Sequence, residues 1–114
     1  MIVVTTPYLS GYRIVESKGM VFGLVVRSRG LSGNIVAGLR SLAGGEIHEY
    51  TQLLEDTRRQ ALDRLVQNAT VMGANAVISM RFDSSEMASY MTEIVAYGTA
   101  VVVEPDASAK PVSE

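Results

Sequence analysis

Short apolar runs, most with a period of two, predict the strands of this chain. β-Branched and aromatic residues fill these runs, and a glycine-containing turn at 17–19 separates the second run from the third, as in a hairpin. In the fourth run, Ala76, Ile78, Met80 and Phe82 fall on one face. The pattern predicts strands at residues 2–5, 12–16, 20–28, 76–83 and 93–104, with a polar connection over 84–90.

A helical period stands between the third and fourth strands. From about residue 46 to 72, apolar side chains recur every three or four residues, and Gly73 is typical of a helix end. A shorter helix is expected over 35–42, with Asn34 as its N-cap. Strands and helices are segregated, so the predicted fold class is α+β. A mixed or antiparallel sheet carries the long helix across it, and the short helix precedes the long one.

One domain accounts for most of the 114 residues, because single domains commonly have about 100–150 residues. This domain is expected over residues 1–104. Residues 105–114 have low hydrophobicity and predict a flexible C-terminal tail.

The composition excludes several classes of function. The chain has no cysteine, which rules out a disulfide framework, a thiolate zinc site, an iron–sulfur cluster and a cysteine nucleophile. Ten Lys and Arg against twelve Asp and Glu give a net charge of -2, so nucleic acid is not an expected partner. No apolar run reaches the roughly 18 residues of a membrane span, and the first residues lack a signal-peptide pattern. We therefore expect a cytoplasmic protein without membrane contact.

The apolar residues exceed what one helix can cover. Hydrophobic residues make up 47% of the chain and charged residues 19%. The segments 20–26, 76–82 and 94–103 are apolar on both faces of the predicted sheet. Since the long helix covers one face, the other face predicts contact with neighbouring subunits and hence a homo-oligomer.

The chain resembles the YbjQ family of small bacterial proteins over nearly all of residues 1–104, with similar spacing. The resemblance rests on Thr5-Thr6, Gly11-Tyr12-Arg13-Ile14, Gly19-Met-Val-Phe-Gly23, Gly44-Gly45-Glu46, Gly73-Ala-Asn-Ala-Val77, Arg81-Phe82-Asp83 and Ala96-Tyr97-Gly98-Thr99-Ala100-Val101. It implies a subunit of dodecin-like architecture that assembles into a ring, as a pentamer. The family is also labelled heavy-metal-binding, which implies a divalent heavy metal as the cofactor.

The metal label can be compared with the residues present. Glu46, His48 and Glu49 stand together at the start of the long helix and are the candidate ligands. Without cysteine, these residues would need ligands from another subunit. The alternative is that His48 is a solvated residue beside acidic neighbours.

The other polar candidates fall at the edges of apolar segments. Arg58, Arg81, Asp83 and Glu93 are interpreted as ion pairs or hydrogen bonds within or between subunits, because charges at such places are usually paired. Tyr50, Tyr97 and Thr99 are candidates for lining a pocket between subunits; alternatively, the tyrosine rings pack and their hydroxyls find partners.

Three functions remain open at this point. The first is a non-enzymatic, ring-forming homo-oligomer that binds a small ligand or a partner at subunit boundaries. The second is a heavy-metal-binding protein. The third is an enzyme built at the interface from Glu46, Tyr50, Arg58 and Glu93, but no nucleophile or tuned acid–base pair indicates a reaction.

Overall fold

The computed structural model of the protein describes residues 1–28, 48–88 and 91–106. Its elements are β1 (Ile2–Val3), β2 (Tyr12–Ser28), α2 (His48–Val71), β3 (Ala76–Ala88) and β4 (Met91–Pro105). The strands form one sheet in the order β1-β3-β4-β2. β4 pairs antiparallel with β2 and β3, and β1 pairs parallel with β3, so the sheet is mixed.

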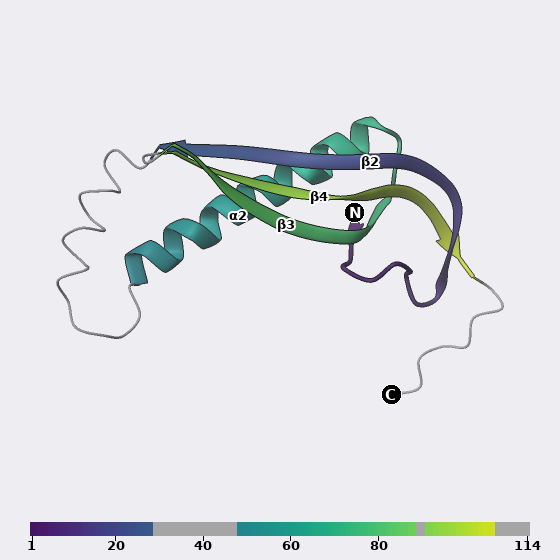
Figure 1. Cartoon of the computed structure of the whole chain (residues 1–114). Coiled ribbons are helices and arrows are strands. Elements are labelled where there is room, and N and C mark those ends of the chain that lie inside the picture. Colours follow the sequence, from purple (N-terminus) through teal and green to yellow (C-terminus); the bar gives the residue numbers. More distant parts are fainter. Residues whose placement is uncertain (29–47, 89–90, 107–114) are drawn as a thin grey trace.

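The helix runs along one face of this sheet (Figure 1). The predicted α+β class, with one long helix across a mixed sheet, is confirmed. α2 ends where the period predicts, because Gly73 takes a φ of 85°. The Gly73 amide then donates to Thr70 O and the Ala74 amide to Ala69 O, at 3.0 and 3.1 Å, which closes the helix end. The short helix expected over 35–42, and nearly all of the predicted tail, lie outside the described residues. Among the described residues, no helix combines the length and hydropathy needed to cross a bilayer.

The predicted hairpin at 17–19 is wrong, because β2 is one continuous strand of 17 residues. Both halves of β2 pair with the same partner, β4, and not with each other. The register shifts between Ile14 and Glu16 and again between Ser17 and Gly19, and Gly19 has a φ of 101°. The glycine therefore serves a bulge instead of a chain reversal, and bulges bend the strand. Figure 1 shows this bend where β2 and β4 curve together.

The predicted polar connection over 84–90 is also mostly strand. β3 continues to Ala88, and Ser84, Ser85 and Glu86 pair with Ile94, Glu93 and Thr92 of β4. Because strands pair through hydrogen bonds between backbone groups, a segment with polar side chains can still form a strand. At the other end of the chain, the first strand covers two residues instead of the predicted four.

A bulge in β3 overturns the predicted alternation of its side chains. The register shifts between Ile78 and Arg81, and Ser79 has a φ of 54°. Opposite this bulge stands Gly98, where a Cβ would lie 2.8 Å from Val77 Cγ1. Because of the extra residue, Met80 and Phe82 pack on the face of α2, whereas Ala76 and Ile78 face the other way.

Two apolar clusters result, one on each face of the sheet. The cluster under α2 is the larger and comprises Val21, Val25, Ala61, Leu65, Ala69, Ala74, Val77, Ile94, Ala96 and Ala100. The second cluster comprises Leu9, Ala76, Ile78, Val101 and Val103, with Val4 packed against it. The N-terminal segment 4–9 therefore covers one end of the face that α2 leaves uncovered. Backbone hydrogen bonds from the Ser79 amide to Thr6 O and from the Met80 amide to Val4 O hold it there.

Candidate functional site

The candidate site is the remainder of the sheet face that points away from α2, which we call the open face. Alternate residues of β2 project there. Met20 is 73% exposed and Phe22 is 50% exposed. Val21, which lies between them in the sequence, and Val25 point to the opposite face and are buried under α2. Leu24 and Val26 are likewise exposed. One strand thus gives an apolar surface to each side of the sheet.

Strand pairing extends the open face into rows across three strands. Phe22 pairs with Tyr97, which pairs with Arg81. In the next row, Leu24 pairs with Val95 and Val95 with Asp83. The neighbouring rows place Glu93 beside Val26 and Thr99 beside Met20. The face is therefore apolar along β2, mixed along β4 and charged along β3.

The open face brings together five of the residues proposed from the sequence: Arg81, Asp83, Glu93, Tyr97 and Thr99. Arg58 does not join them, because its guanidinium carbon lies 5.2 Å from the centre of the Phe82 ring on the face of α2. Such a distance allows a cation–π contact. The backbones of His48, Glu49 and Tyr50 form the first turn of α2. Glu46 lies outside the described residues.

Two of the charged candidates, Arg81 and Asp83, make hydrogen bonds within the described chain, which is one of the two kinds of contact predicted for them. Within the described chain, Arg81 Nη1 donates to the carbonyls of Thr5 and Met80, each at 2.8 Å, and so ties the N-terminal segment to β3. The Asp83 carboxylate accepts the amide of Ser84 at 2.9 Å. Ion pairs within the described residues join Arg13 to Glu104 and Lys18 to Glu16. Pairing of Arg81, Asp83 or Glu93 with another subunit stays a prediction.

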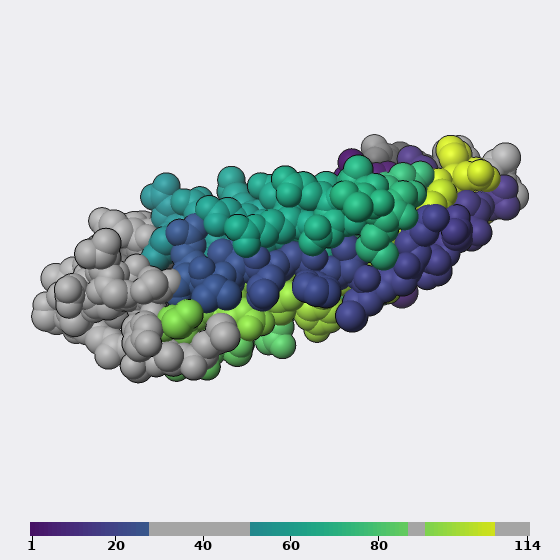
Figure 2. All heavy atoms as spheres, turned by 90° about the horizontal axis from the view of Figure 1, so that it is seen from above, coloured from purple at the N-terminus to yellow at the C-terminus, as the bar shows by residue number. Residues whose placement is uncertain are grey.

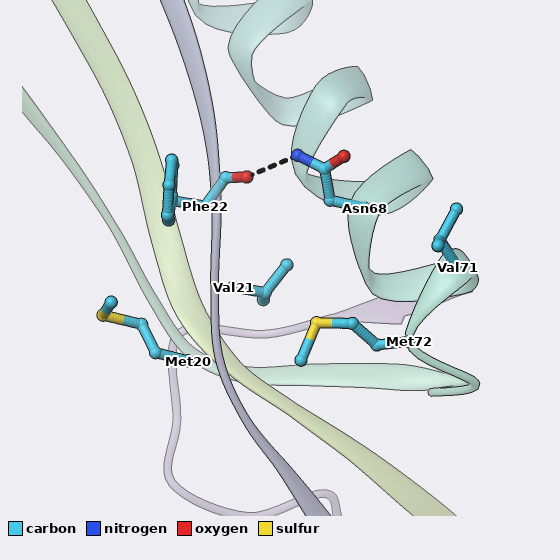
Figure 3. A pocket seen from close by; sticks show the side chains of 6 residues that line it. All are labelled: Met20, Val21, Phe22, Asn68, Val71 and Met72. Atoms are coloured by element: carbon cyan, nitrogen blue, oxygen red, sulfur yellow. Dashed lines mark hydrogen bonds between the residues drawn. The ribbon is translucent and has the colours of Figure 1, made fainter.

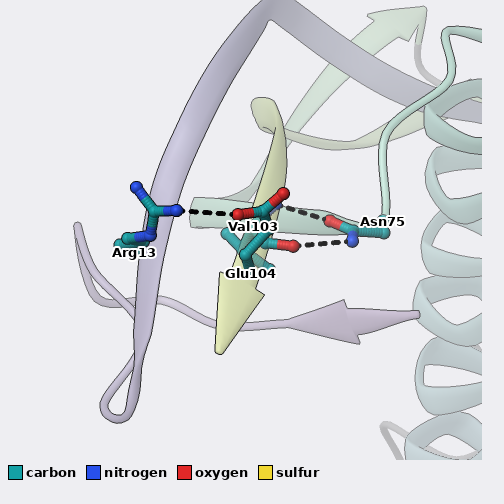
Figure 4. A network of polar contacts seen from close by, with 4 residues as sticks. All are labelled: Arg13, Asn75, Val103 and Glu104. Carbon is teal, nitrogen blue, oxygen red and sulfur yellow. Dashed lines mark hydrogen bonds and ion pairs between the residues drawn. The ribbon is translucent and has the colours of Figure 1, made fainter. Parts of the chain in front are cut away.

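Polar contacts at the bent end of the sheet fix β4 on both sides (Figure 4). Arg13 donates to Glu104 at 2.9 Å across the β2–β4 pair. The Asn75 amide group bonds both backbone groups of Val103, its Nδ2 donating to the carbonyl at 2.9 Å and its Oδ1 accepting the amide at 2.8 Å. Asn75 thus takes the place of a strand residue just before β3 begins. Sequence reasoning did not single out Asn75, because no local spacing indicates a partner 28 residues away.

A shallow groove of about 320 Å³ adjoins the open face at the outer side of β2 (Figure 3). It is lined by Met20, Val21, Phe22, Asn68, Val71 and Met72. Val71, at the end of α2, is 88% exposed. Apolar surface therefore continues from the open face around β2 to the C-terminal end of the helix.

The part of the chain that the structure describes contains no group of three or more His, Asp or Glu side chains placed to hold a metal ion. Glu46 and the side chains of His48 and Glu49 lie outside the part of the chain that the structure describes, so the metal site at the start of α2 stays a prediction. The family model described as "Putative heavy-metal-binding" nevertheless matches residues 1–104. The chain belongs to the YbjQ family.

Relatives of this YbjQ-family chain come from both bacteria and archaea, so the family is not confined to bacteria and the expected bacterial origin of this chain is not confirmed. A UPF0145 protein of Bradyrhizobium sp. is 67% identical over 105 residues, which cover 92% of this chain and 95% of the relative. UPF0145 proteins of Methanoregula boonei and Picrophilus torridus are each 65% identical. The matches cover 96% of this chain and 91% of the Methanoregula protein, and 92% of this chain and 89% of the Picrophilus protein.

A solved structure supports the fold. The crystal structure of a protein from Pediococcus pentosaceus that belongs to the DUF74 family matches with a TM-score of 0.60. The match covers 91% of this chain and 98% of that chain, at 18% sequence identity. At that identity, the likeness concerns the fold alone.

Proposed function

We propose that the protein is a non-enzymatic homo-oligomer whose copies pack through the open face and bind a small ligand or a partner at the subunit boundaries. The observation that carries this function is the exposed apolar row on β2: Met20, Phe22, Leu24 and Val26. Contiguous apolar surface of this kind is typical of interaction sites. Burying a side chain such as Phe or Leu contributes roughly 1.5–3 kcal/mol, so four neighbouring side chains favour association strongly.

A second copy of the chain is the occupant that the open face suits best. The face carries a cation, Arg81, and two acids, Asp83 and Glu93, on the same surface as its apolar row. A neighbouring copy therefore presents both apolar side chains and charges of the opposite sign. Complementary charges of this kind fix register and exclude wrong partners. The family resemblance favours a closed ring of five copies.

The polar side chains of the open face are the candidates for ligand contact at the boundary between copies. Tyr97 and Thr99 supply hydroxyl groups. Arg81 uses its Nη1 to donate to the carbonyls of Thr5 and Met80, so its other guanidinium N–H groups can donate to a ligand. These groups flank the apolar row without belonging to it. A ligand held there would need both an apolar body and acceptor oxygens.

Native mass spectrometry of the purified chain over a dilution series tests the assembly. We expect one closed species of five copies that persists on dilution into the low micromolar range. A monomer at every concentration would overturn the proposed function. A closed assembly with another copy number would keep the function and replace the pentamer.

Heavy-metal binding is the alternative function, which the family description supports. Its candidate ligands are Glu46, His48 and Glu49. Isothermal titration with zinc, copper and nickel salts tests it, with His48→Ala as the matched variant. Stoichiometric binding that this variant weakens would establish a metal site, and the absence of heat at micromolar metal would remove it.

A further inference from the structure

The outer edge of β2 points its backbone groups at α2. Among the described residues, β2 is the last strand in the order β1-β3-β4-β2, and no described strand lies beside its outer edge. In an antiparallel pair, alternate residues direct both N–H and C=O away from the partner strand. Phe22 and Leu24 are such residues, because their carbonyls accept hydrogen bonds from α2. An edge of this kind is a template on which a strand of another chain can pair.

Two side chains of α2 donate hydrogen bonds to these outward-facing carbonyls. Asn68 Nδ2 donates to Phe22 O at 2.8 Å (Figure 3), and Arg64 Nη1 donates to Leu24 O. The two donors are four residues apart on the helix, a rise of about 6 Å. The two carbonyls are two residues apart on the strand, about 6.6 Å. The spacing of the donors therefore matches the spacing of the carbonyls.

Gly23, between the two carbonyls, lets the helix come this close. A Cβ at this position would collide with the backbone carbonyl of Ala61 and the backbone nitrogen of Leu65. Seen from above, α2 lies side by side with β2 (Figure 2). Glycine in the middle of a strand thus permits backbone contact with the helix, and this contact puts Arg64 and Asn68 within reach of the strand edge.

We propose that Arg64 and Asn68 close the edge of β2 to strand addition, so that another copy of this chain is received on the open face and not by edge pairing. This inference deepens the proposed function and rests on it. Without the two donors, Phe22 and Leu24 would offer free carbonyls on a strand whose exposed side chains are apolar. Asn68 also lines the apolar groove, where an added strand could place its side chains. The result would be open-ended growth in place of a closed assembly.

Sedimentation velocity on four folded proteins tests this inference. They are the wild type, Arg64→Ala with Asn68→Ala, the donor-retaining Arg64→Lys with Asn68→Gln, and the control Asp63→Ala with Gln67→Ala. The control residues are exposed on the same helix, each one position before its counterpart. We expect the alanine pair at 64 and 68 to raise the weight-average mass about twofold or more, with a broad size distribution. The donor-retaining pair and the control pair keep the wild-type distribution.

An unchanged distribution for the folded alanine pair at 64 and 68 would overturn the inference, and so would equal growth in the control pair. If that alanine pair does not fold by circular dichroism, Asn68→Leu takes its place. Leucine keeps the branched shape of asparagine, favours helix and cannot donate, while Arg64 keeps its own bond to Leu24 O, so a smaller increase in mass is expected and an unchanged mass would overturn the inference. The wild type in the same run separates the two proposals: a wild-type monomer overturns the proposed function, whereas unchanged variants overturn only the closed edge.

Discussion

Neighbouring residues of β2 lie in opposite surroundings. Val21 and Val25 are buried under α2, whereas Met20, Phe22 and Leu24 project from the open face. All five side chains are apolar, so hydrophobicity does not decide which are covered. The sheet has two apolar faces, and within the described residues a helix covers one face and a short N-terminal segment covers one end of the other. The difference shows that cover by α2, and not hydrophobicity, separates the two sets of side chains, and the exposed set forms the surface that we propose for association.

The largest effect is expected at the contact between β2 and α2. Gly23→Ala places a Cβ against the backbone of Ala61 and Leu65, neither of which can move without shifting the helix. We expect a loss of about 3 kcal/mol or more in the free energy of unfolding, measured in urea. The control is Gly11→Ala, where nothing lies within 4 Å and only the φ of 81° opposes alanine. That control should lose about 1–2 kcal/mol, and equal losses at both positions would contradict the close helix contact.

A second pair of variants compares the two faces directly. Leu65→Ala removes a fully buried side chain on the α2 side, and we expect a loss of about 2–5 kcal/mol in stability. Leu24→Ala removes the same atoms from the open face. At the lowest protein concentration that can be measured, we expect a loss below about 1 kcal/mol. A Leu24→Ala loss as large as that of Leu65→Ala in a dissociated protein would show that Leu24 belongs to the internal core.

Arg81→Ala tests what covers the end of the open face. The variant removes the two bonds from the guanidinium to the carbonyls of Thr5 and Met80. We expect a loss of about 1 kcal/mol and faster hydrogen exchange at the Ser79 and Met80 amides, which bond the N-terminal segment. Arg81→Lys should restore part of the protection. Unchanged exchange at both amides in Arg81→Ala would mean that Arg81 does not hold the segment.

The smallest effect is expected for the exposed ion pair at the bent end of the sheet. Arg13 and Glu104 lie 2.9 Å apart, but their side chains are 61% and 55% exposed. A double-mutant cycle with Arg13→Ala and Glu104→Ala should give a coupling of about 0.2–1 kcal/mol that falls with added salt. A coupling well above that range would indicate that the pair is desolvated, for example by a neighbouring subunit.

The sequence predicts the elements whose pattern is complete within one segment. The stripe of period 3.6 predicts the whole described length of α2 and its end to within one residue, and the alternation predicts most of β4. It does not separate a hairpin glycine from a bulge glycine at Gly19, because that choice depends on whether β4 is long enough to pair with both halves of β2. Likewise, the bulge at Ser79 requires Gly98 on another strand.

The candidate site was predictable in part. Charges within apolar strands singled out Arg81, Asp83 and Glu93, and the structure brings them to one face. The partners of Arg81 are backbone carbonyls, which no side-chain pattern encodes. No local pattern in the sequence distinguishes Arg64 and Asn68 from the other polar residues of the helix. The signal that could have found them is Gly23, since a glycine inside a strand indicates close backbone approach.

The central claim is that the open face holds the copies of this chain together. Light scattering coupled to size-exclusion chromatography compares the wild type with Phe22→Ser plus Leu24→Ser, and with Val71→Ser as the control. Val71 is the most exposed of these apolar side chains and lies at the end of α2, outside the open face. We predict that the wild type and Val71→Ser elute as the same assembly, while the folded open-face variant elutes as a monomer. An open-face variant that keeps the wild-type mass would contradict the claim.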